Sequence, residues 1–253
     1  MKLRNLQPYF AMKLKALRYY LNQFGRRDAV RYWIAQVVQE RFDPHLIPSY
    51  SQTGEDRIIM HLLSSTKKGF YVDVGCNHPQ HRSNTFELYK KGWTGISIDA
   101  NQKLIQKHFS TRPNDISIAT AVSDREGEAL FTEFSEDCVS SLSAEHVKKW
   151  SARCEVVQQT TIATTTLTRI LKEHHVPCEF ELLSIDVEGH DFAALKSLDL
   201  KAYRPKLIVI EISQYELTNP ASSEIYTYLI EHDYCLIGYV IVNAYFVARE
   251  TVA

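Results

Sequence analysis

Short apolar runs alternate with amphipathic stretches along most of the chain. Five runs predict strands, at residues 69–74, 95–98, 116–122, 180–185 and 206–212. Between most of them, apolar residues recur at helical spacing, near residues 83–91, 101–109, 167–175 and 190–198. Continuous apolar strands separated by amphipathic helices are typical of a parallel sheet that is covered by helices on both faces.

Further predicted elements extend this core. Residues 129–134 and 155–164 predict two strands inserted between the third and fourth strands of the sheet. A helix near residues 222–232 precedes two runs, 235–242 and 244–249, which should pair antiparallel because only Asn243 separates them. The expected fold is α/β, with a Rossmann-like, doubly wound, mostly parallel sheet and a C-terminal antiparallel hairpin. Before the sheet, the segment 53–56 resembles a capping box for a helix at about residues 53–64.

Residues 1–48 predict a separate basic helical arm. Apolar residues recur at helical spacing at Leu6, Phe10, Leu14, Leu17 and Leu21, and again at Val30, Ile34, Val37 and Val38. The segment holds nine Lys or Arg against three acidic residues, a net charge of +6, whereas the whole chain carries −1. This shift, with Pro44 and Pro48, predicts a boundary between the arm and a domain at 49–253. The arm either packs on the domain or on a second copy of the chain, or contacts a membrane peripherally.

Composition excludes several classes of protein. Hydrophobic residues at 45% and charged residues at 23% are typical of a globular chain. No apolar run approaches the roughly 20 residues of a membrane span, and the start lacks the apolar block of a secretory signal. The five cysteines form no Cys-x-x-Cys pair, so reduced thiols in the cytoplasm are expected, with membrane-peripheral contact through the arm as the alternative. The net charge of −7 outside the arm disfavours nucleic acid as a partner.

Acidic residues lie at the ends of the predicted strands. Asp73, Asp99, Asp186 and Glu211 close four of the five strands, and Asp124 follows the third. In an open parallel sheet, ligands bind beyond the carboxyl ends of the strands, where the strand order reverses. Each acid taken alone is also a common helix cap. Together they predict an acceptor-rich rim for a ligand that carries hydrogen-bond donors and positive charge.

The turn after the first strand argues against cofactors that carry a pyrophosphate. It reads Gly75-Cys-Asn-His-Pro79, with one glycine and a proline that removes a donor, instead of Gly-x-Gly-x-x-Gly. S-adenosylmethionine has no phosphate and presents an amine, ribose hydroxyls and a sulfonium, which favour carboxylates. Asp99 lies 26 residues after Asp73, where an acid is suited to accept from both ribose hydroxyls.

Five motifs, in this order, resemble the FkbM family of S-adenosylmethionine-dependent methyltransferases. They are YSQTGED at 50–56, GFYVDVG at 69–75, SNT at 83–85, KGWTGI at 91–96 and IDVEG at 185–189. The resemblance spans about residues 50 to 215 and leaves the arm and the C-terminal tail uncovered. It implies a class I methyltransferase fold and methyl transfer, usually to a hydroxyl oxygen of a sugar or secondary metabolite.

The resemblance also implies site residues. Asp73, Gly75 and Asp99 would hold the cofactor, and the segment that contains Gln52 would lie over the same pocket. Neighbouring residues at the strand ends and in the SNT motif complete the predicted cofactor site: Cys76, Asn84, Ala100, Ser123 and Asp124. Cys76 stands where the family usually has Ala. For Asn84, a helix cap is the alternative role.

The fourth strand end supplies the candidates for catalysis. We expect Asp186 near the methyl group and the acceptor, with Glu188 or His190 as the base or as the group that orients it. Alternatively, Glu188 caps the next helix and His190 is solvated. Asp186 and Glu211 are also suited to begin a magnesium or calcium site, but no third ligand is evident, so no metal is expected.

These observations predict an O-methyltransferase with a small-molecule or glycan acceptor. The alternative is a non-catalytic partner-binding or membrane-docking protein that retains the fold and works through its basic arm. The Ser140-Ser141 pair lies in the inserted segment, near the expected mouth of the acceptor site, and the sequence assigns it no role.

Overall fold

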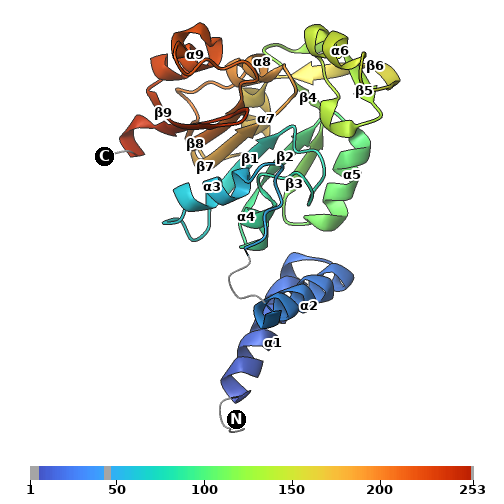
Figure 1. Cartoon of the computed structure of the whole chain (residues 1–253), viewed down its shortest axis with the longest axis vertical. Helices are drawn as coiled ribbons and strands as arrows, with labels where there is room; N and C mark the ends of the chain where they lie inside the picture. The colour runs from blue at the N-terminus through green and yellow to red at the C-terminus, as the bar shows by residue number, and fades with distance from the viewer. Residues whose placement is uncertain (1–5, 43–46, 252–253) are drawn as a thin grey trace.

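The structure is a computed structural model that describes residues 6–42 and 47–251. A seven-stranded sheet in the order β3-β2-β1-β7-β8-β10-β9 forms its centre (Figure 1). The strands are β1 (Phe70–Val74), β2 (Thr94–Asp99), β3 (Ile116–Ala119), β7 (Glu179–Ile185), β8 (Arg204–Glu211), β9 (Tyr234–Val240) and β10 (Asn243–Ala248). The first five are parallel to one another, and β10 pairs antiparallel with both β8 and β9. The predicted mostly parallel α/β sheet with a C-terminal hairpin is confirmed.

Helices cover both faces of the sheet and create two apolar cores. One core holds Val72, Ile98 and Ile185 against α7 (Leu167–Glu173), α8 (Asp191–Lys196) and α9 (Glu224–Glu231). The other holds Tyr71 and Leu182 against α3 (Glu55–Leu62) and α4 (Phe86–Lys90). Successive strand residues point to opposite faces, so β1 contributes Tyr71 to one core and Val72 to the other.

The order of the strands reverses between β1 and β7. The chain runs from β1 outward to β2 and β3, then returns to add β7 and β8 on the other side of β1. Val74 lies in register with Ile185, and the Asp186 amide donates to the Val74 carbonyl at 3.0 Å. The segments after these two strands therefore leave the sheet side by side, which is the arrangement that opens a crevice for ligands.

The third predicted strand is divided in the structure. Residues 116–122 were expected to form one strand, but β3 ends at Ala119 and β4 (Ala121–Val122) joins a second, three-stranded sheet. The Thr120 amide donates to the Asp99 carbonyl at 3.0 Å, and the chain then leaves the main sheet. The predicted strand ran on to residue 122 because the apolar run is continuous. Such a run does not show where the chain passes from one sheet to another.

The second sheet is the inserted segment that the sequence predicted. β5 (Gly127–Phe134) and β6 (Val156–Thr165) pair antiparallel, and β4 pairs with β6. Helix α6 (Ala144–Trp150), between β5 and β6, was not predicted, because its sequence AEHVKKW is short and mostly polar. Ser143 caps it by accepting from the His146 amide.

Helix α3 is present, but the predicted capping box is wrong. Gly54 occupies the N-cap with φ 97°, and no side chain caps the helix. The Asp56 carboxylate instead accepts from the Tyr50 amide and the Ser51 hydroxyl, at 2.7 and 3.0 Å. The first turn of α3 therefore holds the preceding residues, Tyr50 and Ser51, in place through the Asp56 side chain.

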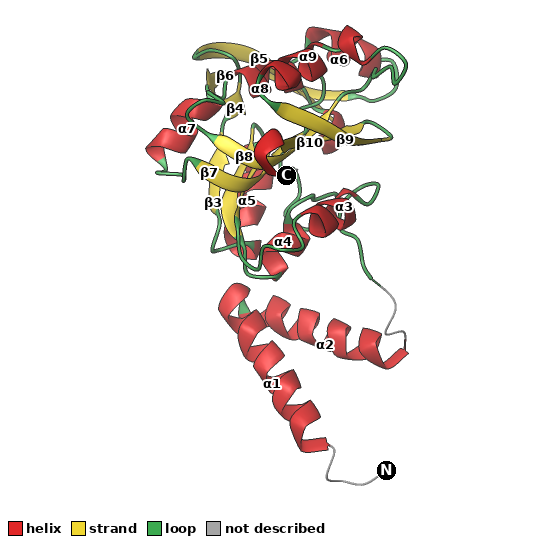
Figure 2. Cartoon of the chain, turned by 90° about the vertical axis from the view of Figure 1, so that its left-hand side faces the viewer, coloured by secondary structure: helices red, strands yellow, loops and turns green. Residues whose placement is uncertain are grey.

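The arm consists of α1 (Leu6–Gln23) and α2 (Arg26–Phe42), and it packs on the body beside α4 (Figure 2). Tyr20 and Phe24 are buried in the core that contains Phe86 and Tyr89. The Gln23 amide group donates to the Tyr89 carbonyl at 3.0 Å, and the Tyr89 hydroxyl donates to the Gln23 carbonyl at 2.7 Å. Aromatic packing and a reciprocal pair of hydrogen bonds therefore hold the arm.

The aliphatic face from which the arm was predicted is not the face that packs. The exposed large apolar residues of α1 and α2 include Leu14, Leu21, Val30, Ile34 and Val38. The side chains of Leu6 and Phe10, and Pro44 at the predicted boundary, lie outside the described residues. The boundary at residue 48 stays a prediction. Within residues 6–42 and 47–251, no helix combines the length and hydropathy of a transmembrane span.

Candidate functional site

A pocket opens at the carboxyl ends of β1, β2 and β7, where the strand order reverses. Its wall includes six of the predicted site residues: Gln52, Gly75, Asp99, Ala100, Asp186 and Glu188. Gly75 has φ +80°, and a Cβ there would lie 1.8 Å from the Asp186 carbonyl oxygen. Only glycine therefore permits the two turns to approach this closely.

Asp99 lies on the pocket wall, and backbone amides hold its carboxylate in place. Its two carboxylate oxygens accept from the Asn77 and Asn101 amides, at 2.9 and 2.8 Å. These bonds fix the carboxylate at the end of β2. The arrangement suits a ligand that presents two adjacent hydroxyls.

Three carboxyl groups meet at the far side of the pocket. Asp186, Glu188 and Glu211 each place an oxygen within 4.8 Å of the others. Burial raises the pKa of all three groups, and the charge on Asp186 raises those of Glu188 and Glu211 further. Glu188 is thus the third acidic side chain, beside Asp186 and Glu211, that the sequence did not reveal as a ligand, and the geometry of the three carboxyls would admit a metal ion.

Three predicted cofactor residues lie behind the pocket wall. Asp73 is 4% exposed and accepts from the Thr85 hydroxyl at 2.6 Å. The Cys76 sulfur lies 3.4 Å from Nε2 of His108, and the Asn84 amide group donates to the Ser184 hydroxyl at 3.1 Å. Asn84 does not cap α4 either, since Thr85 is the N-cap. These side chains are turned into the protein because they anchor the turn that forms the wall.

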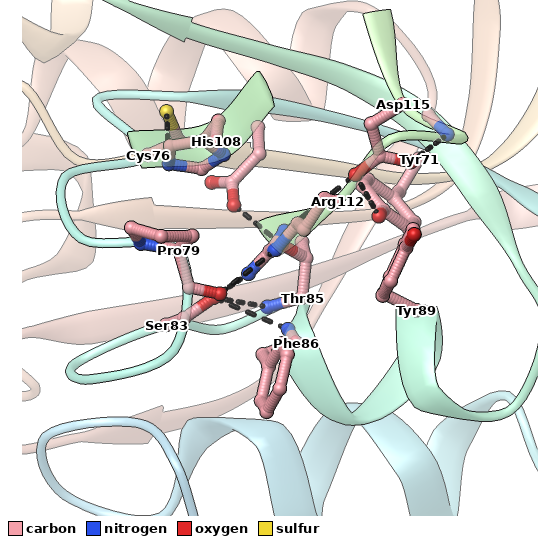
Figure 3. Close-up of polar contacts among 12 residues, drawn as sticks. Tyr71, Cys76, Pro79, Ser83, Thr85, Phe86, Tyr89, His108, Arg112 and Asp115 are labelled. Carbon is pink, nitrogen blue, oxygen red and sulfur yellow. Dashed lines mark hydrogen bonds and ion pairs between the residues drawn. The ribbon is translucent and has the colours of Figure 1, made fainter. Parts of the chain in front are cut away.

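A buried cation organises this anchoring, and sequence reasoning missed it. Arg112, fully buried, donates to the Pro79 carbonyl, the Thr85 hydroxyl and the Ser83 hydroxyl, at 2.8, 2.8 and 2.6 Å (Figure 3). Asp115 lies 3.8 Å from its guanidinium. Because Thr85 in turn binds Asp73, one side chain connects the loop after β1 with the strand itself. An Arg just before a proline gives no sign of burial in the sequence.

Ser123, Asp124 and His190 lie together, but outside the pocket wall. Nε2 of His190 lies 3.0 Å from the Ser123 hydroxyl, and Asp124 is exposed. The split of the third predicted strand explains this placement, because residues 121–124 follow β4 into the second sheet. The structure therefore does not bring His190 to Asp186 and Glu188.

Glu188 is not a helix cap. Asp191 occupies the first turn of α8, and its carboxylate accepts from the Val187 and Gly189 amides, each at 2.9 Å. Glu188 adopts φ 52°, a left-handed conformation that non-glycine residues rarely hold, and this directs its side chain to the carboxyl cluster. The capping alternative for Glu188 is wrong.

The inserted segment closes the pocket. Cys138, Ser140, Ser141 and Leu142 line it, and the Ser141 hydroxyl donates to the Glu188 carbonyl at 2.7 Å. Backbone bonds between Ser141 and Thr132 in both directions, at 3.0 and 3.1 Å, join this loop to β5. The Ser140-Ser141 pair thus forms part of the wall.

Comparison with known proteins agrees with this geometry. The family model for the methyltransferase FkbM domain matches residues 73–236, well over half of the 253 residues. The match begins at the end of β1, includes the reversal point and ends in β9. No match was found among the curated proteins.

Proposed function

Because the chain belongs to the FkbM methyltransferase family, as the match over residues 73–236 shows, we propose that it moves a methyl group from S-adenosylmethionine to a hydroxyl oxygen of a small molecule or glycan. The proposal includes the class I methyltransferase fold, with the mostly parallel sheet as its Rossmann-like core. The acceptor-rich pocket at the strand reversal is the observation that carries it.

The chemistry of the pocket fits this cofactor. When bound, S-adenosylmethionine supplies an electrophilic methyl group on a sulfonium. Asp99 would hold the ribose hydroxyls, and the carboxyl cluster at Asp186 would face positive charge. The turn after β1 offers one glycine and a proline where a pyrophosphate needs several amide donors. A phosphate-free cationic ligand satisfies such a wall better than a dinucleotide does.

The residues around the cluster can also assist the acceptor. A hydroxyl oxygen is a weak nucleophile, and a base that removes its proton as the new bond forms contributes typically 10²- to 10⁴-fold. The cluster holds carboxyls of raised pKa, so near neutral pH it contains both protonated and ionised groups. It can therefore accept a proton while it still stabilises positive charge.

Calorimetry with S-adenosylmethionine and S-adenosylhomocysteine tests the proposal directly. We expect both to bind wild-type protein, and Asp99→Ala to weaken binding at least tenfold because the oriented carboxylate is lost. Asp124→Ala, at an exposed acid outside the pocket, is the matched control and should bind as wild type does. Failure of both ligands to bind the wild type would reject the cofactor assignment.

The exposed aliphatic residues on the arm favour a second candidate function, docking on an anionic membrane surface. Val30, Ile34 and Val38 share one face of α2, and Arg27 and Arg31 lie beside them. The net charge of +6 on residues 1–48 complements anionic headgroups.

Vesicle flotation tests the docking function. We expect the full chain to float with vesicles that contain phosphatidylserine and not with phosphatidylcholine alone, and Ile34→Glu to abolish flotation. Dimerisation measured by light scattering, without flotation, would instead identify a second copy as the occupant. A monomer that does not float would reject both.

A further inference from the structure

The wall of the pocket carries acidic side chains at two places and a basic side chain at one. Asp99 lies at the end of β2, and Asp186 and Glu188 follow β7. Arg82 is the one basic side chain among the described residues that line the pocket. A single cation on an otherwise acidic wall indicates where the pocket can receive a negatively charged group.

The loop after β1 holds the backbone of Arg82 in place. The next residue, Ser83, is buried, and its backbone amide donates to the Tyr50 carbonyl at 3.0 Å. The Ser83 hydroxyl accepts from Arg112 at 2.6 Å. Arg82 itself adopts φ 56°, in the left-handed region that residues other than glycine rarely occupy. The backbone is therefore anchored here, whereas the Arg82 side chain is exposed and accessible to a ligand.

The contacts of the Arg82 guanidinium leave its charge uncompensated. It donates to the sulfur of Cys138, in the inserted segment. Burial raises the pKa of that thiol, so the thiol stays uncharged near pH 7, and it is a weak acceptor. None of the ion pairs among the described residues includes Arg82. An anionic ligand would therefore gain a charge-assisted hydrogen bond without displacing a carboxylate.

Arg82 acts on the part of the pocket that holds the carboxyl cluster. Its hydrogen-bond partner Cys138 lines the pocket together with Asp186 and Glu188. Burial raises the pKa of Glu188 to about 8, and the positive charge of Arg82 is a smaller influence that lowers it. The cation and the cluster are thus close enough to interact, and one ligand can meet both.

These charges match the amino-acid part of the proposed cofactor. S-adenosylmethionine and S-adenosylhomocysteine carry an α-ammonium and an α-carboxylate on the same carbon. Asp186 and Glu188 would attract the ammonium and repel the carboxylate. Arg82 is the group on this wall that can offset the repulsion, because the paired N–H donors of a guanidinium match the geometry of a carboxylate.

We propose that Arg82 binds the carboxylate of the cofactor's amino-acid part. This inference rests on the proposed methyltransferase function and adds to it a binding residue that lies outside all five sequence motifs. Arg82 would hold one end of the cofactor and Asp99 the ribose, and the sulfur that carries the methyl group lies between these two parts of the molecule. Contacts on both sides of the sulfur restrict the orientation of the methyl group toward an acceptor.

Calorimetry with two ligands tests the assignment without an acceptor. S-adenosylhomocysteine carries the carboxylate, whereas its decarboxylated analogue keeps the adenosine and the amine and lacks the carboxylate. We expect Arg82→Gln to weaken binding of S-adenosylhomocysteine by about tenfold or more, because a charge-assisted hydrogen bond is lost. Binding of the decarboxylated analogue should not weaken, because that ligand is cationic and gains nothing from Arg82.

Two further variants make the test specific. Arg82→Lys keeps the charge but not the paired donors, so its affinity for S-adenosylhomocysteine should lie between those of wild type and Arg82→Gln. Arg125→Gln makes the same change of charge at an exposed residue outside the pocket wall and should bind both ligands as wild type does. Thermal melting of Arg82→Gln should match wild type, since the side chain is exposed.

The outcomes separate this inference from the proposed function. If wild-type protein binds neither S-adenosylmethionine nor S-adenosylhomocysteine, the proposed function fails and the inference fails with it. If wild type binds both and Arg82→Gln binds S-adenosylhomocysteine equally tightly, the inference fails alone. Equal weakening of both calorimetry ligands would show that Arg82 maintains the shape of the pocket, which also overturns the inference. Loss of methyl transfer with unchanged cofactor binding would assign Arg82 to an anionic acceptor and overturn it as well.

Discussion

The arm and the carboxyl edge of the sheet both carry strong sequence signals, but the structure uses them differently. The edge collects acids where the strand ends predicted them, and Asp99 and Asp186 share one pocket. The arm forms the predicted helices but packs through Tyr20 and Phe24 instead of its aliphatic residues. Strand topology fixes where a strand end lies, whereas helical periodicity shows only that an apolar face exists. The edge should therefore depend on charge, and the arm on aromatic packing.

The largest expected effect is on the edge. Arg112→Met removes the cation that holds Ser83 and Thr85 and leaves Asp115 unpaired in the interior. Loss of one partner from a buried ion pair costs about 3–5 kcal/mol of unfolding free energy. Urea denaturation measures this, with Arg125→Met, at an exposed position, as the control. A loss below about 1 kcal/mol would show that the edge does not depend on this charge.

The next effect is on the arm. Phe24→Ala removes a ring that contacts Phe86 and Tyr89 at centroid distances of 6.1 and 5.5 Å. Truncation of a buried aromatic residue costs about 3 kcal/mol. Hydrogen exchange in α1 and α2 should therefore accelerate roughly a hundredfold, with no change in the sheet. Equal acceleration in β1 and β7 would contradict the view that the arm is a separately held element.

A smaller effect concerns the pH dependence of stability, which the buried His108 at the carboxyl edge of the sheet should produce. Burial lowers the pKa of His108 to about 3, so the unfolded chain takes up a proton first as the pH falls. Stability should thus decline as the pH falls from about 6.5 toward 3, by at most about 1.4 kcal/mol for each pH unit. His108→Gln should flatten this decline. Thermal melts between pH 4 and 7 provide the measurement, and His175→Gln, at an exposed helix end, should behave as wild type.

The smallest effect is expected at the exposed face of the arm. Ile34 is 49% exposed, so Ile34→Ser should change the unfolding free energy by less than about 0.5 kcal/mol. Thermal unfolding of the isolated chain measures this. A loss comparable with that of Phe24→Ala would mean that the aliphatic face is covered in solution, and would sharpen the case for a second copy.

Much of the sheet was predictable because apolar runs and helical stretches alternate without ambiguity. The strand break at Thr120 was not, since backbone direction leaves no trace in hydropathy. Helix α6 was missed because seven mostly polar residues give no periodic signal.

The site residues that could be predicted are those whose position follows from the direction of the parallel strands. Gly75, Asp99 and Asp186 lie on the pocket wall because they follow parallel strands at the reversal. Asp73 follows the same logic in sequence but precedes the strand end by one residue, and it points into the interior because side chains alternate along a strand. Arg112 comes from a helix end, and only tertiary contacts bring it to the site.

The hydrogen bond from Ser141 to the Glu188 carbonyl joins the inserted segment to the residues that follow β7. Residues 127–165 add a wall to the pocket, yet none of the seven main strands lies within this segment. The insertion can therefore change in length or sequence without altering the register of the main sheet. A change confined to residues 127–165 would therefore alter one wall of the pocket and leave the strand ends that carry Gly75, Asp99 and Asp186 in place.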